Sequence, residues 1–206
     1  EARNLKWIQL TWAGADKYAK MIALPEDLCI TNARGAFGQI ISEYIIGNII
    51  ALYRNFPQYW NSQRYHKWEP LGSNSTIYGK NVLILGTGDI GHNTAKRLKA
   101  FDAKTIGVRR SKEKETLEFF DEIYNLGELD DLLPKADIVI GCLPNTQETR
   151  DILNYKRLSL MKKDAVLINV GRGSLIKTGD LIKILKDGHL KGVALDVFEK
   201  EPLDDD

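Results

Sequence analysis

The sequence predicts an α/β fold in which a doubly wound parallel sheet carries helices on both faces. Two observations lead to this prediction. Short strands alternate regularly with helical segments after residue 79, and the strands are apolar throughout rather than on alternate residues. Continuously apolar strands are typical of a parallel sheet that is covered on both sides.

The elements of the expected sheet follow one another closely. Strands are predicted at residues 81–85, 104–108, 121–124, 137–143, 165–170 and 192–198. Helices are predicted between them at residues 90–100, 126–135, 154–161 and 177–186. Connections in such a fold are right-handed crossovers, so ligands are expected at the carboxyl ends of the strands.

The amino-terminal part of the chain has a different pattern. Residues 5–10 and 28–31 are expected to form short strands. Apolar residues at three-to-four spacing predict a long helix over residues 36–55, buried on more than one side and ended or bent by Pro57. Residues 57–78 are rich in aromatic side chains and show no regular period. They form an arm that either covers a neighbouring subunit or folds back over its own domain.

Composition argues against several functional classes. The 206 residues carry 29 Lys and Arg against 28 Asp and Glu, a net charge of +1, which gives no electrostatic basis for nucleic acid or a membrane surface as partner. No apolar run approaches the ~20 residues that span a bilayer, and no leader is visible at Glu1, so a cytoplasmic location is expected. Cys29 and Cys142 lie far apart, so neither a disulfide framework nor a metal site is expected.

A glycine-rich loop follows the strand predicted at residues 81–85. It consists of Gly86, Thr87, Gly88, Asp89, Ile90 and Gly91. In this pattern the first glycine makes a tight turn, the second leaves room for a pyrophosphate, and the third allows close packing of helix on strand. The helix that begins there offers N–H groups to phosphate. A purely structural turn is the alternative, but the order of strand, loop, helix and strand favours a Rossmann-type dinucleotide site.

The end of the second strand bears on which dinucleotide is bound. In NAD sites an Asp or Glu about 20 residues beyond the loop accepts hydrogen bonds from the ribose. Here the strand ends in Arg109, Arg110 and Ser111, without a carboxylate. Because guanidinium groups form charge-assisted bonds to phosphate, NADP is favoured, and NAD remains possible.

Several further segments, taken in order, resemble the D-isomer-specific 2-hydroxyacid dehydrogenases. They are residues 5–16, 31–44, 136–149, 161–173 and 194–202. The resemblance implies a dinucleotide-binding Rossmann domain at residues 34–206, truncated at its carboxyl end. A remnant of a flavodoxin-like substrate domain would precede it at residues 1–33.

The resemblance also implies an oxidoreductase that moves a hydride between NAD(P) and a 2-keto or 2-hydroxy acid of D configuration. Arg172 would hold the substrate carboxylate and polarise its carbonyl. Glu201 would pair with a general-acid histidine. Glu199 is the competing candidate for that role and is expected to be solvated. Asp196 would accept from the nicotinamide carboxamide.

Other positions are implied as contacts of the cofactor or the substrate. The cofactor wall would comprise Leu143, Pro144, Thr149, Val170 and Gly171. The backbone N–H groups of Ala13 and Gly14 would bind the substrate carboxylate. The long helix and the aromatic arm, together with the resemblance, predict a homodimer formed through the cofactor domains.

One part of the family pattern is missing from the sequence. The catalytic histidine should follow Glu201, whereas the histidines present are His66, His92 and His189, each expected to be structural. We therefore expect the chain to bind dinucleotide with little or no turnover. The main alternative is a regulatory or corepressor-like module that binds NAD(P) without catalysis. A second alternative is an unrelated Rossmann enzyme acting on S-adenosylmethionine or a nucleotide sugar.

Overall fold

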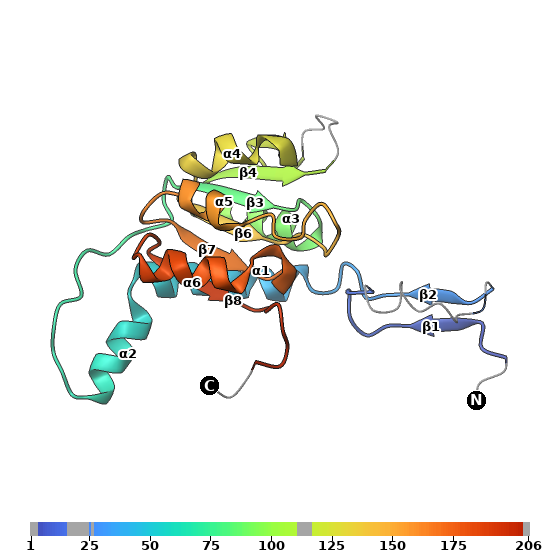
Figure 1. The fold of residues 1–206 in the computed structure, drawn as a ribbon, viewed down its shortest axis with the longest axis horizontal. Helices are drawn as coiled ribbons and strands as arrows, with labels where there is room; N and C mark the ends of the chain where they lie inside the picture. The colour runs from blue at the N-terminus through green and yellow to red at the C-terminus, as the bar shows by residue number, and fades with distance from the viewer. Residues whose placement is uncertain (1–3, 16–24, 26, 111–116, 204–206) are drawn as a thin grey trace.

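The chain forms two separate parallel sheets, seen in the computed structural model as a small pair of strands beside a larger sheet (Figure 1). The structure describes residues 4–15, 25, 27–110 and 117–203. The small sheet pairs β1 (Trp7–Gln9) with β2 (Cys29–Thr31). The larger sheet contains β3 (Asn81–Leu85), β4 (Lys104–Arg109), β5 (Glu122–Asn125), β6 (Ile138–Gly141), β7 (Val166–Asn169) and β8 (Gly192–Leu195).

The six strands lie in the order β5-β4-β3-β6-β7-β8, and every neighbouring pair is parallel. The predicted doubly wound fold is confirmed. The chain moves outward from β3 to β4 and β5, then returns to place β6 on the other side of β3. Open α/β sheets bind ligands at such a reversal, outside the carboxyl ends of the strands.

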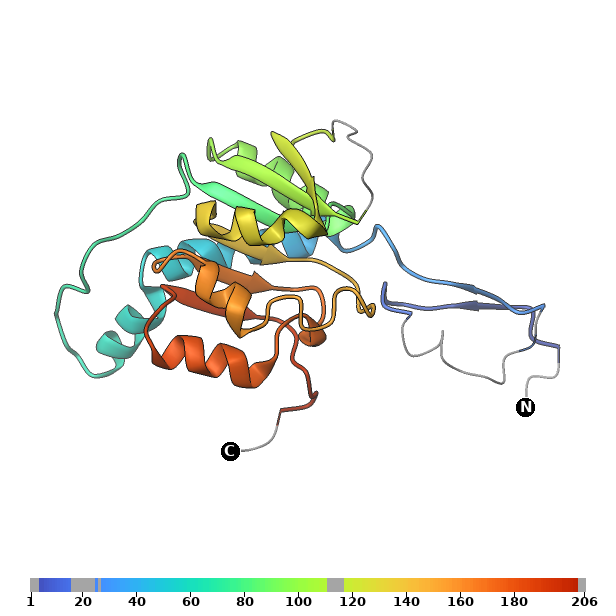
Figure 2. The same ribbon diagram turned by 45° about the horizontal axis from the view of Figure 1, so that its top comes forward.

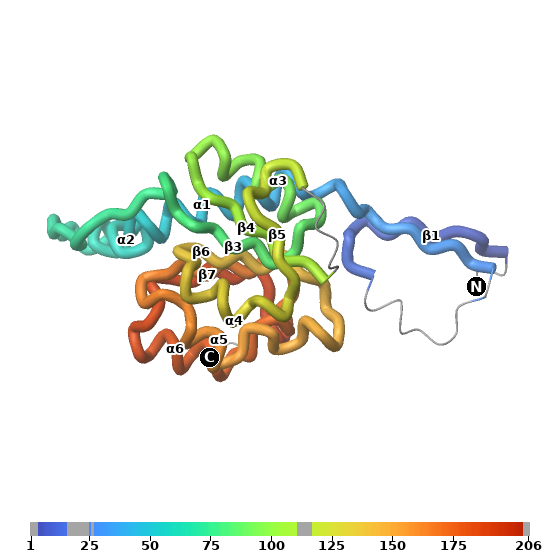
Figure 3. The backbone as a smooth tube through the Cα atoms, turned by 90° about the horizontal axis from the view of Figure 1, so that it is seen from above, coloured from blue at the N-terminus to red at the C-terminus, as the bar shows by residue number. Residues whose placement is uncertain are grey.

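Helices cover both faces of the larger sheet (Figure 3). The helices are α1 (Gly38–Tyr53), α2 (Phe56–Arg64), α3 (Asp89–Lys99), α4 (Leu129–Leu132), α5 (Tyr155–Leu160) and α6 (Thr178–Lys186). Short 3-10 turns are η1 (Leu126–Glu128), η2 (Leu133–Lys135) and η3 (Gly173–Leu175). Among the described helices, none is long and apolar enough to cross a membrane.

The core consists of one apolar cluster on each face of the sheet. Val82 and Ile84 of β3 pack with α1 and α3, while Leu83 and Leu85 pack with α4, α5 and α6. All four side chains are fully buried. Successive side chains of a strand point to opposite faces, so a strand with helices on both sides is apolar at every position.

Helix α1 is buried along a narrower surface than the sequence predicts. Its buried residues form one stripe, Gly38, Ser42, Ile45, Ile49 and Tyr53. Ile40 is 68% exposed and Tyr44 is 41% exposed, so part of its apolar surface has no cover within the described chain. The expectation of burial on more than one side is therefore wrong for these two residues.

The aromatic arm contains a helix that the sequence does not predict. Helix α1 ends at Tyr53, Asn55 adopts a left-handed conformation with φ of 54°, and Pro57 lies in the first turn of α2. Proline is tolerated there because the first N–H groups of a helix have no intrahelical partner. Figure 2 shows α2 and the segment after it standing away from the larger sheet. Trp60 is 58% exposed and Trp68 is fully exposed, so they do not fold back over their own domain.

Three other elements differ from the predicted ones. Residues 126–135 divide into η1, α4 and η2 instead of forming one helix. Asn125 caps η1 by accepting from the Gly127 N–H at 2.8 Å, and Pro134, inside η2, has no N–H to continue the helix. The strands predicted at residues 137–143 and 192–198 stop at Gly141 and Leu195, and the chain beyond them builds the candidate site.

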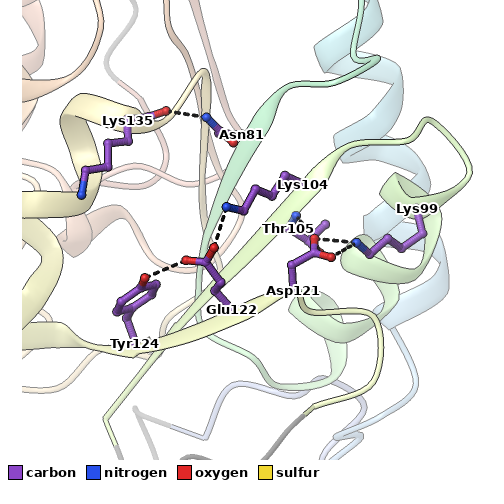
Figure 4. A network of polar contacts seen from close by, with 8 residues as sticks. All are labelled: Asn81, Lys99, Lys104, Thr105, Asp121, Glu122, Tyr124 and Lys135. Carbon is purple, nitrogen blue, oxygen red and sulfur yellow. Dashed lines mark hydrogen bonds and ion pairs between the residues drawn. The ribbon is translucent and has the colours of Figure 1, made fainter.

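Charged side chains fasten β5, the edge strand, to β4 (Figure 4). The Glu122 carboxylate pairs with the Lys104 ammonium and accepts from the Tyr124 hydroxyl at 2.6 Å. The Asp121 carboxylate pairs with Lys99 and accepts from the Thr105 N–H at 2.7 Å. Lys104 and Glu122 begin their strands, so this network lies at the amino ends of the sheet, opposite the candidate site.

Candidate functional site

The glycine-rich loop connects β3 to α3 at the point where the strand order reverses. Gly86 has φ of +106°, and a Cβ there would lie 2.9 Å from the Cys142 carbonyl oxygen. A Cβ on Gly91 would lie 1.9 Å from the Gly86 carbonyl oxygen. The first and third glycines are therefore required by backbone conformation and by packing, as the motif predicts.

The second glycine faces open space. A Cβ at Gly88 would meet no atom within 4 Å, and Gly88 is the N-cap residue of α3 without a side-chain cap bond. Uncapped N–H groups at a helix start, next to bare backbone, fit a phosphate group. Thr87, Asp89 and Ile90 are half-buried around this opening. The geometry fits the diphosphate of a dinucleotide.

Two of the predicted NADP-selecting residues, Arg109 and Arg110, lie at the carboxyl end of β4, which pairs with β5. Arg109 ends β4 opposite Asn125 of β5 and is half-buried. Arg110 is exposed and lines a pocket of about 320 Å³ together with Asn125, Leu126, Gly127, Glu148, Ile152 and Arg157. Ser111 lies outside the described residues. The Arg110 guanidinium therefore borders a pocket beyond the carboxyl ends of β4 and β5. Ligands bind at this edge of the sheet in this fold.

The residues predicted to form the cofactor wall lie together beyond β6 and β7. A Cβ at Gly171 would be 2.7 Å from the Leu143 carbonyl oxygen, and the Val170 N–H donates to the Gly141 carbonyl at 3.0 Å. Thr149 is buried, and its hydroxyl donates to the Pro144 carbonyl at 2.6 Å. This bond and those between Thr149 and Thr146 join the two ends of the loop after β6 to each other.

The segments that carry Arg172, Asp196 and Glu201 converge after β7 and β8. A Cβ on Gly173 would lie 1.9 Å from the Phe198 backbone, so these two stretches are in direct contact. The Asp196 N–H donates to the Asn169 carbonyl at 2.9 Å, and its side chain is exposed. One Arg172 nitrogen donates to the Gly171 carbonyl at 2.7 Å.

Each of the two candidate glutamates holds backbone N–H groups. The Glu201 carboxylate accepts from the Phe198 N–H at 2.8 Å. Glu199 accepts from the Thr178 N–H at the start of α6. Hydrogen bonds from Thr178 hold the pKa of the Glu199 carboxyl below its usual range. Glu199 is thus exposed, as expected, but it also caps a helix, a role that the sequence does not reveal.

The segment that follows β1 reaches the same region. Ala13 lines a cavity of about 120 Å³, with the other lining residues Arg34, Gly35, Phe37, Gly88, Asp89, Ile90, Gly91 and Cys142. The Ala13 carbonyl accepts from the Asn32 side chain at 2.8 Å, which ties the predicted substrate loop to the connection before α1. Gly14 follows it and is half-buried. The structure therefore brings the predicted substrate residue Ala13 beside the glycine-rich loop.

The sequence reasoning about the site missed four residues that line this cavity, namely Arg34, Gly35, Phe37 and Cys142. Arg34 precedes α1, and no local motif marks it as a ligand. Cys142 directly follows β6 and directly precedes Leu143, so its position after a strand at the reversal point was the available signal. Burial raises the pKa of the Cys142 thiol to about 12, and both cysteines are free thiols.

The three histidines have other local roles. The Nε2 atom of His189 forms a hydrogen bond with the Met161 carbonyl at 2.8 Å. The His92 ring packs edge-on against the Phe119 ring, with 5.2 Å between the two ring centroids. His66 is exposed in the turn after α2, with a positive φ. Among the described residues, no group of three or more His, Cys, Asp or Glu side chains is arranged to hold a metal ion.

Comparisons with known proteins agree with this architecture. A family model described as the NAD binding domain of D-isomer specific 2-hydroxyacid dehydrogenase matches residues 46–206. A glyoxylate reductase of Thermofilum pendens is 36% identical over 213 residues, covering 98% of this chain and 61% of the relative.

Solved structures show the same likeness. A D-isomer specific 2-hydroxyacid dehydrogenase family protein from Aeromonas salmonicida has a TM-score of 0.90 and 39% identity, covering 100% of this chain and 65% of that one. An NADPH-dependent glyoxylate/hydroxypyruvate reductase from Sinorhizobium meliloti, in complex with NADP and sulfate, has a TM-score of 0.86 and 30% identity, covering 98% and 64%. This chain therefore spans between 61% and 65% of the length of these three proteins.

Proposed function

The chain belongs to the D-isomer-specific 2-hydroxyacid dehydrogenase family, and we propose on that premise that it serves hydride transfer between NAD(P) and a 2-keto or 2-hydroxy acid of D configuration. The observation that carries the proposal is the opening at Gly88, bordered by the predicted substrate residue Ala13 at the end of the sheet where the strand order reverses. One crevice then receives both the dinucleotide and the acid.

The cofactor side of the site is assigned from the loop and the wall. Residues 86–91 would bind the diphosphate through N–H groups at the start of α3. The wall formed by Leu143, Pro144, Thr149, Val170 and Gly171 would bury the nucleotide. Asp196 is exposed at the end of β8 and would accept from the carboxamide. The bound nicotinamide supplies or accepts the hydride.

The substrate side relies on charge and on backbone donors. Arg172 would hold the carboxylate and stabilise the negative charge that develops on the C2 oxygen, while Ala13 and Gly14 would add N–H groups. Glu201 would favour the protonated form of a histidine partner. Since the relatives named above include glyoxylate and glyoxylate/hydroxypyruvate reductases, we propose small 2-keto acids of that kind as substrates.

The reaction class is tested in the full-length protein by following NADPH and NADH oxidation with glyoxylate or hydroxypyruvate. Arg172→Lys should lower kcat/KM by about 100-fold, because a single ammonium cannot hold a carboxylate and a carbonyl as a planar fork does. Unchanged kinetics in that variant would contradict the role of Arg172. Absence of oxidation with any 2-keto acid by a folded protein would contradict the reaction class.

We further propose that NADP is preferred over NAD. Arg109 and Arg110 supply two guanidinium groups at the strand end where a ribose-binding acid is expected in NAD sites, and Arg110 faces a pocket. Titration of NADPH and NADH by nicotinamide fluorescence tests the preference. Equal or tighter binding of NADH would contradict it.

The 206 residues assayed alone should bind dinucleotide with little or no turnover. The reason is that His66, His92 and His189 occupy the other places described above, which leaves carbonyl reduction without an assigned proton donor. Measurable 2-keto acid reduction by a purified sample of this chain would contradict the proposal.

A homodimer is proposed through the cofactor domain. Ile40 and Tyr44 on α1 and Trp60 and Trp68 in the arm leave apolar surface in solvent along neighbouring elements. Exposed apolar surface of this kind is typical of a surface that a partner covers, and a second copy with two-fold symmetry would cover it on both chains.

A further inference from the structure

The cavity beside the glycine-rich loop is bordered by one basic side chain, that of Arg34. This residue lies on the connection between β2 and α1, which passes the amino end of α3. Gly38, at the start of α1, is packed so closely that a Cβ there would lie 2.3 Å from the Asp89 carboxylate. The connection that carries Arg34 is therefore held against the phosphate-binding end of α3.

The glycine-rich loop itself presents an unfavourable charge to a diphosphate. It contains Asp89 and neither Lys nor Arg. The Asp89 carboxylate is held by the Asn93 side chain at 3.1 Å, which keeps this negative charge in the first turn of α3. An acid close to a doubly charged diphosphate weakens binding unless a nearby cation offsets it.

Arg34 is available to supply that cation. Its side chain is exposed, and within the described ranges its guanidinium has no hydrogen bond or ion pair. It borders the same cavity as Gly88, Asp89 and Gly91. A guanidinium there can donate two N–H bonds to phosphate oxygens from the side opposite the α3 N-terminus.

We propose that Arg34 is a diphosphate ligand, which completes the dinucleotide site from outside the glycine-rich loop. This inference rests on the proposed dinucleotide binding and adds a residue to it. The diphosphate is the favoured oxyanion because two of the three loop glycines border the cavity with Arg34. A consequence is that dinucleotide binding engages the chain between the two sheets as well as the larger sheet.

The test compares Arg34→Gln with Arg54→Gln, an equal change of charge at an exposed residue just beyond the other end of α1. Dissociation constants are measured for NADH and NADPH by fluorescence, and for ADP-ribose and adenosine 2′-monophosphate by displacement of NADPH.

Arg34→Gln should weaken the binding of NADH, NADPH and ADP-ribose alike, each by about tenfold. Adenosine 2′-monophosphate lacks the diphosphate and should bind as before. Arg34→Lys should restore part of the loss, and Arg54→Gln should change nothing.

The outcomes separate this inference from the proposed function. If the unmodified chain binds dinucleotide, and the Arg34→Gln variant binds each of the four ligands as tightly as the unmodified chain does, Arg34 is not a diphosphate ligand. A loss that includes adenosine 2′-monophosphate would also overturn the inference, since it would place Arg34 away from the diphosphate. If the unmodified, folded chain binds neither NADH nor NADPH, the proposed function fails and the inference fails with it.

Discussion

At the scale of single residues, the loop glycines divide into two that are tightly packed, Gly86 and Gly91, and one that faces open space, Gly88. Gly91→Ala should cost more than about 2 kcal/mol of unfolding free energy, because the new methyl group would overlap the Gly86 carbonyl oxygen. Gly88→Ala should cost no more than about 1 kcal/mol, since its Cβ meets nothing. The same variant should bind NADPH at least about tenfold more weakly, because the methyl group would occupy space next to the phosphates. Urea unfolding and fluorescence titration measure the two effects.

Gly47→Ala is the matched control for these variants. Gly47 lies inside α1, where a Cβ would meet no atom within 4 Å. Alanine should therefore stabilise the helix by roughly 0.5–1 kcal/mol and leave dinucleotide binding unchanged. Equal losses of stability at Gly88 and Gly91 would contradict the division of roles.

Arg110 provides a second test at the same scale. Arg110→Glu should weaken NADPH by about tenfold, because a carboxylate replaces a guanidinium beside the 2′-phosphate, and should leave NADH within about twofold. Arg64→Glu, an identical change at the exposed end of α2, serves as the control. If Arg110→Glu weakens both dinucleotides by the same factor, Arg110 contacts a part that they share.

The sequence identified candidate residues that belong to a local motif. It missed residues that meet their partners only because distant parts of the chain pack together. The glycine-rich loop was identified because its three constraints lie within six residues of one turn. Arg34 lines the same cavity, although α1, α2 and β3 separate it from the loop in the sequence. Only tertiary packing brings the two together. Glu199 was missed as the cap of α6 for the same reason, since it meets Thr178 only after β8 has paired with β7.

At the scale of elements, the network between β4 and β5 should make stability depend on pH. Burial by itself raises the pKa of the Asp121 carboxyl, but bonds from Lys99 and Thr105 outweigh it and hold that pKa below its usual range. Bonds from Lys104 and Tyr124 lower the pKa of Glu122. Ordinary carboxyl pKa values are about 4, so this stabilisation is complete above pH ~4 and is lost as the pH falls through the lower folded values.

Asp121→Asn tests this effect by thermal unfolding between neutral and acid pH. At neutral pH the variant should lose about 1 kcal/mol, a small amount because the ion pair is partly exposed. As the pH falls below the lowered pKa of Asp121, the stability of the variant should approach that of the unmodified chain, because the Asp121 carboxyl of the unmodified chain is then neutral in the folded and the unfolded state alike. Asp164→Asn changes an exposed carboxylate before β7 and should show neither effect. A constant difference at every pH would contradict the ion-pair explanation.

Secondary structure was predicted best where burial dictates the period. Strand β3 coincides with its predicted range, because its last four residues, Val82 to Leu85, are apolar and fully buried on both faces of the sheet. Helix α2 was missed because its mixture of aromatic and polar residues has no buried face to impose a period. The segment from residue 126 to 135 was predicted as one helix ending near Pro134, because its leucines recur at helical spacing before that proline, whereas the structure divides it into η1, α4 and η2.

At the scale of the whole molecule, the alternation of strands and helices predicted a doubly wound parallel sheet but not the order of its strands. The rule that crossovers are right-handed leaves few arrangements, and the observed order is the one typical of dinucleotide-binding sheets. The position of Ala13 and Arg34, in the segments after β1 and β2, beside the glycine-rich loop depends on tertiary packing, which no local pattern determines. The boundary between residues 33 and 34 and the cytoplasmic location stay predictions.

The proposed dimer makes the last prediction, on the assembly of the whole chain. Light scattering at micromolar concentration should give twice the mass of the 23.3 kDa chain. Replacing Trp60 and Trp68 together by alanine should shift the mass toward a single chain, because large aromatic side chains contribute most of the energy of a typical interface. The change should leave the fold intact, since Trp60 is 58% exposed and Trp68 is fully exposed, so neither supports the core.

Trp7→Ala is the control, because it removes from β1, outside the proposed interface, a tryptophan about as exposed as Trp60. This variant should preserve the dimer. A single-chain mass for the unmodified protein would contradict the proposal. A dimer that survives loss of both tryptophans would instead move the interface from the arm to the exposed apolar side of α1, where Ile40 and Tyr44 lie.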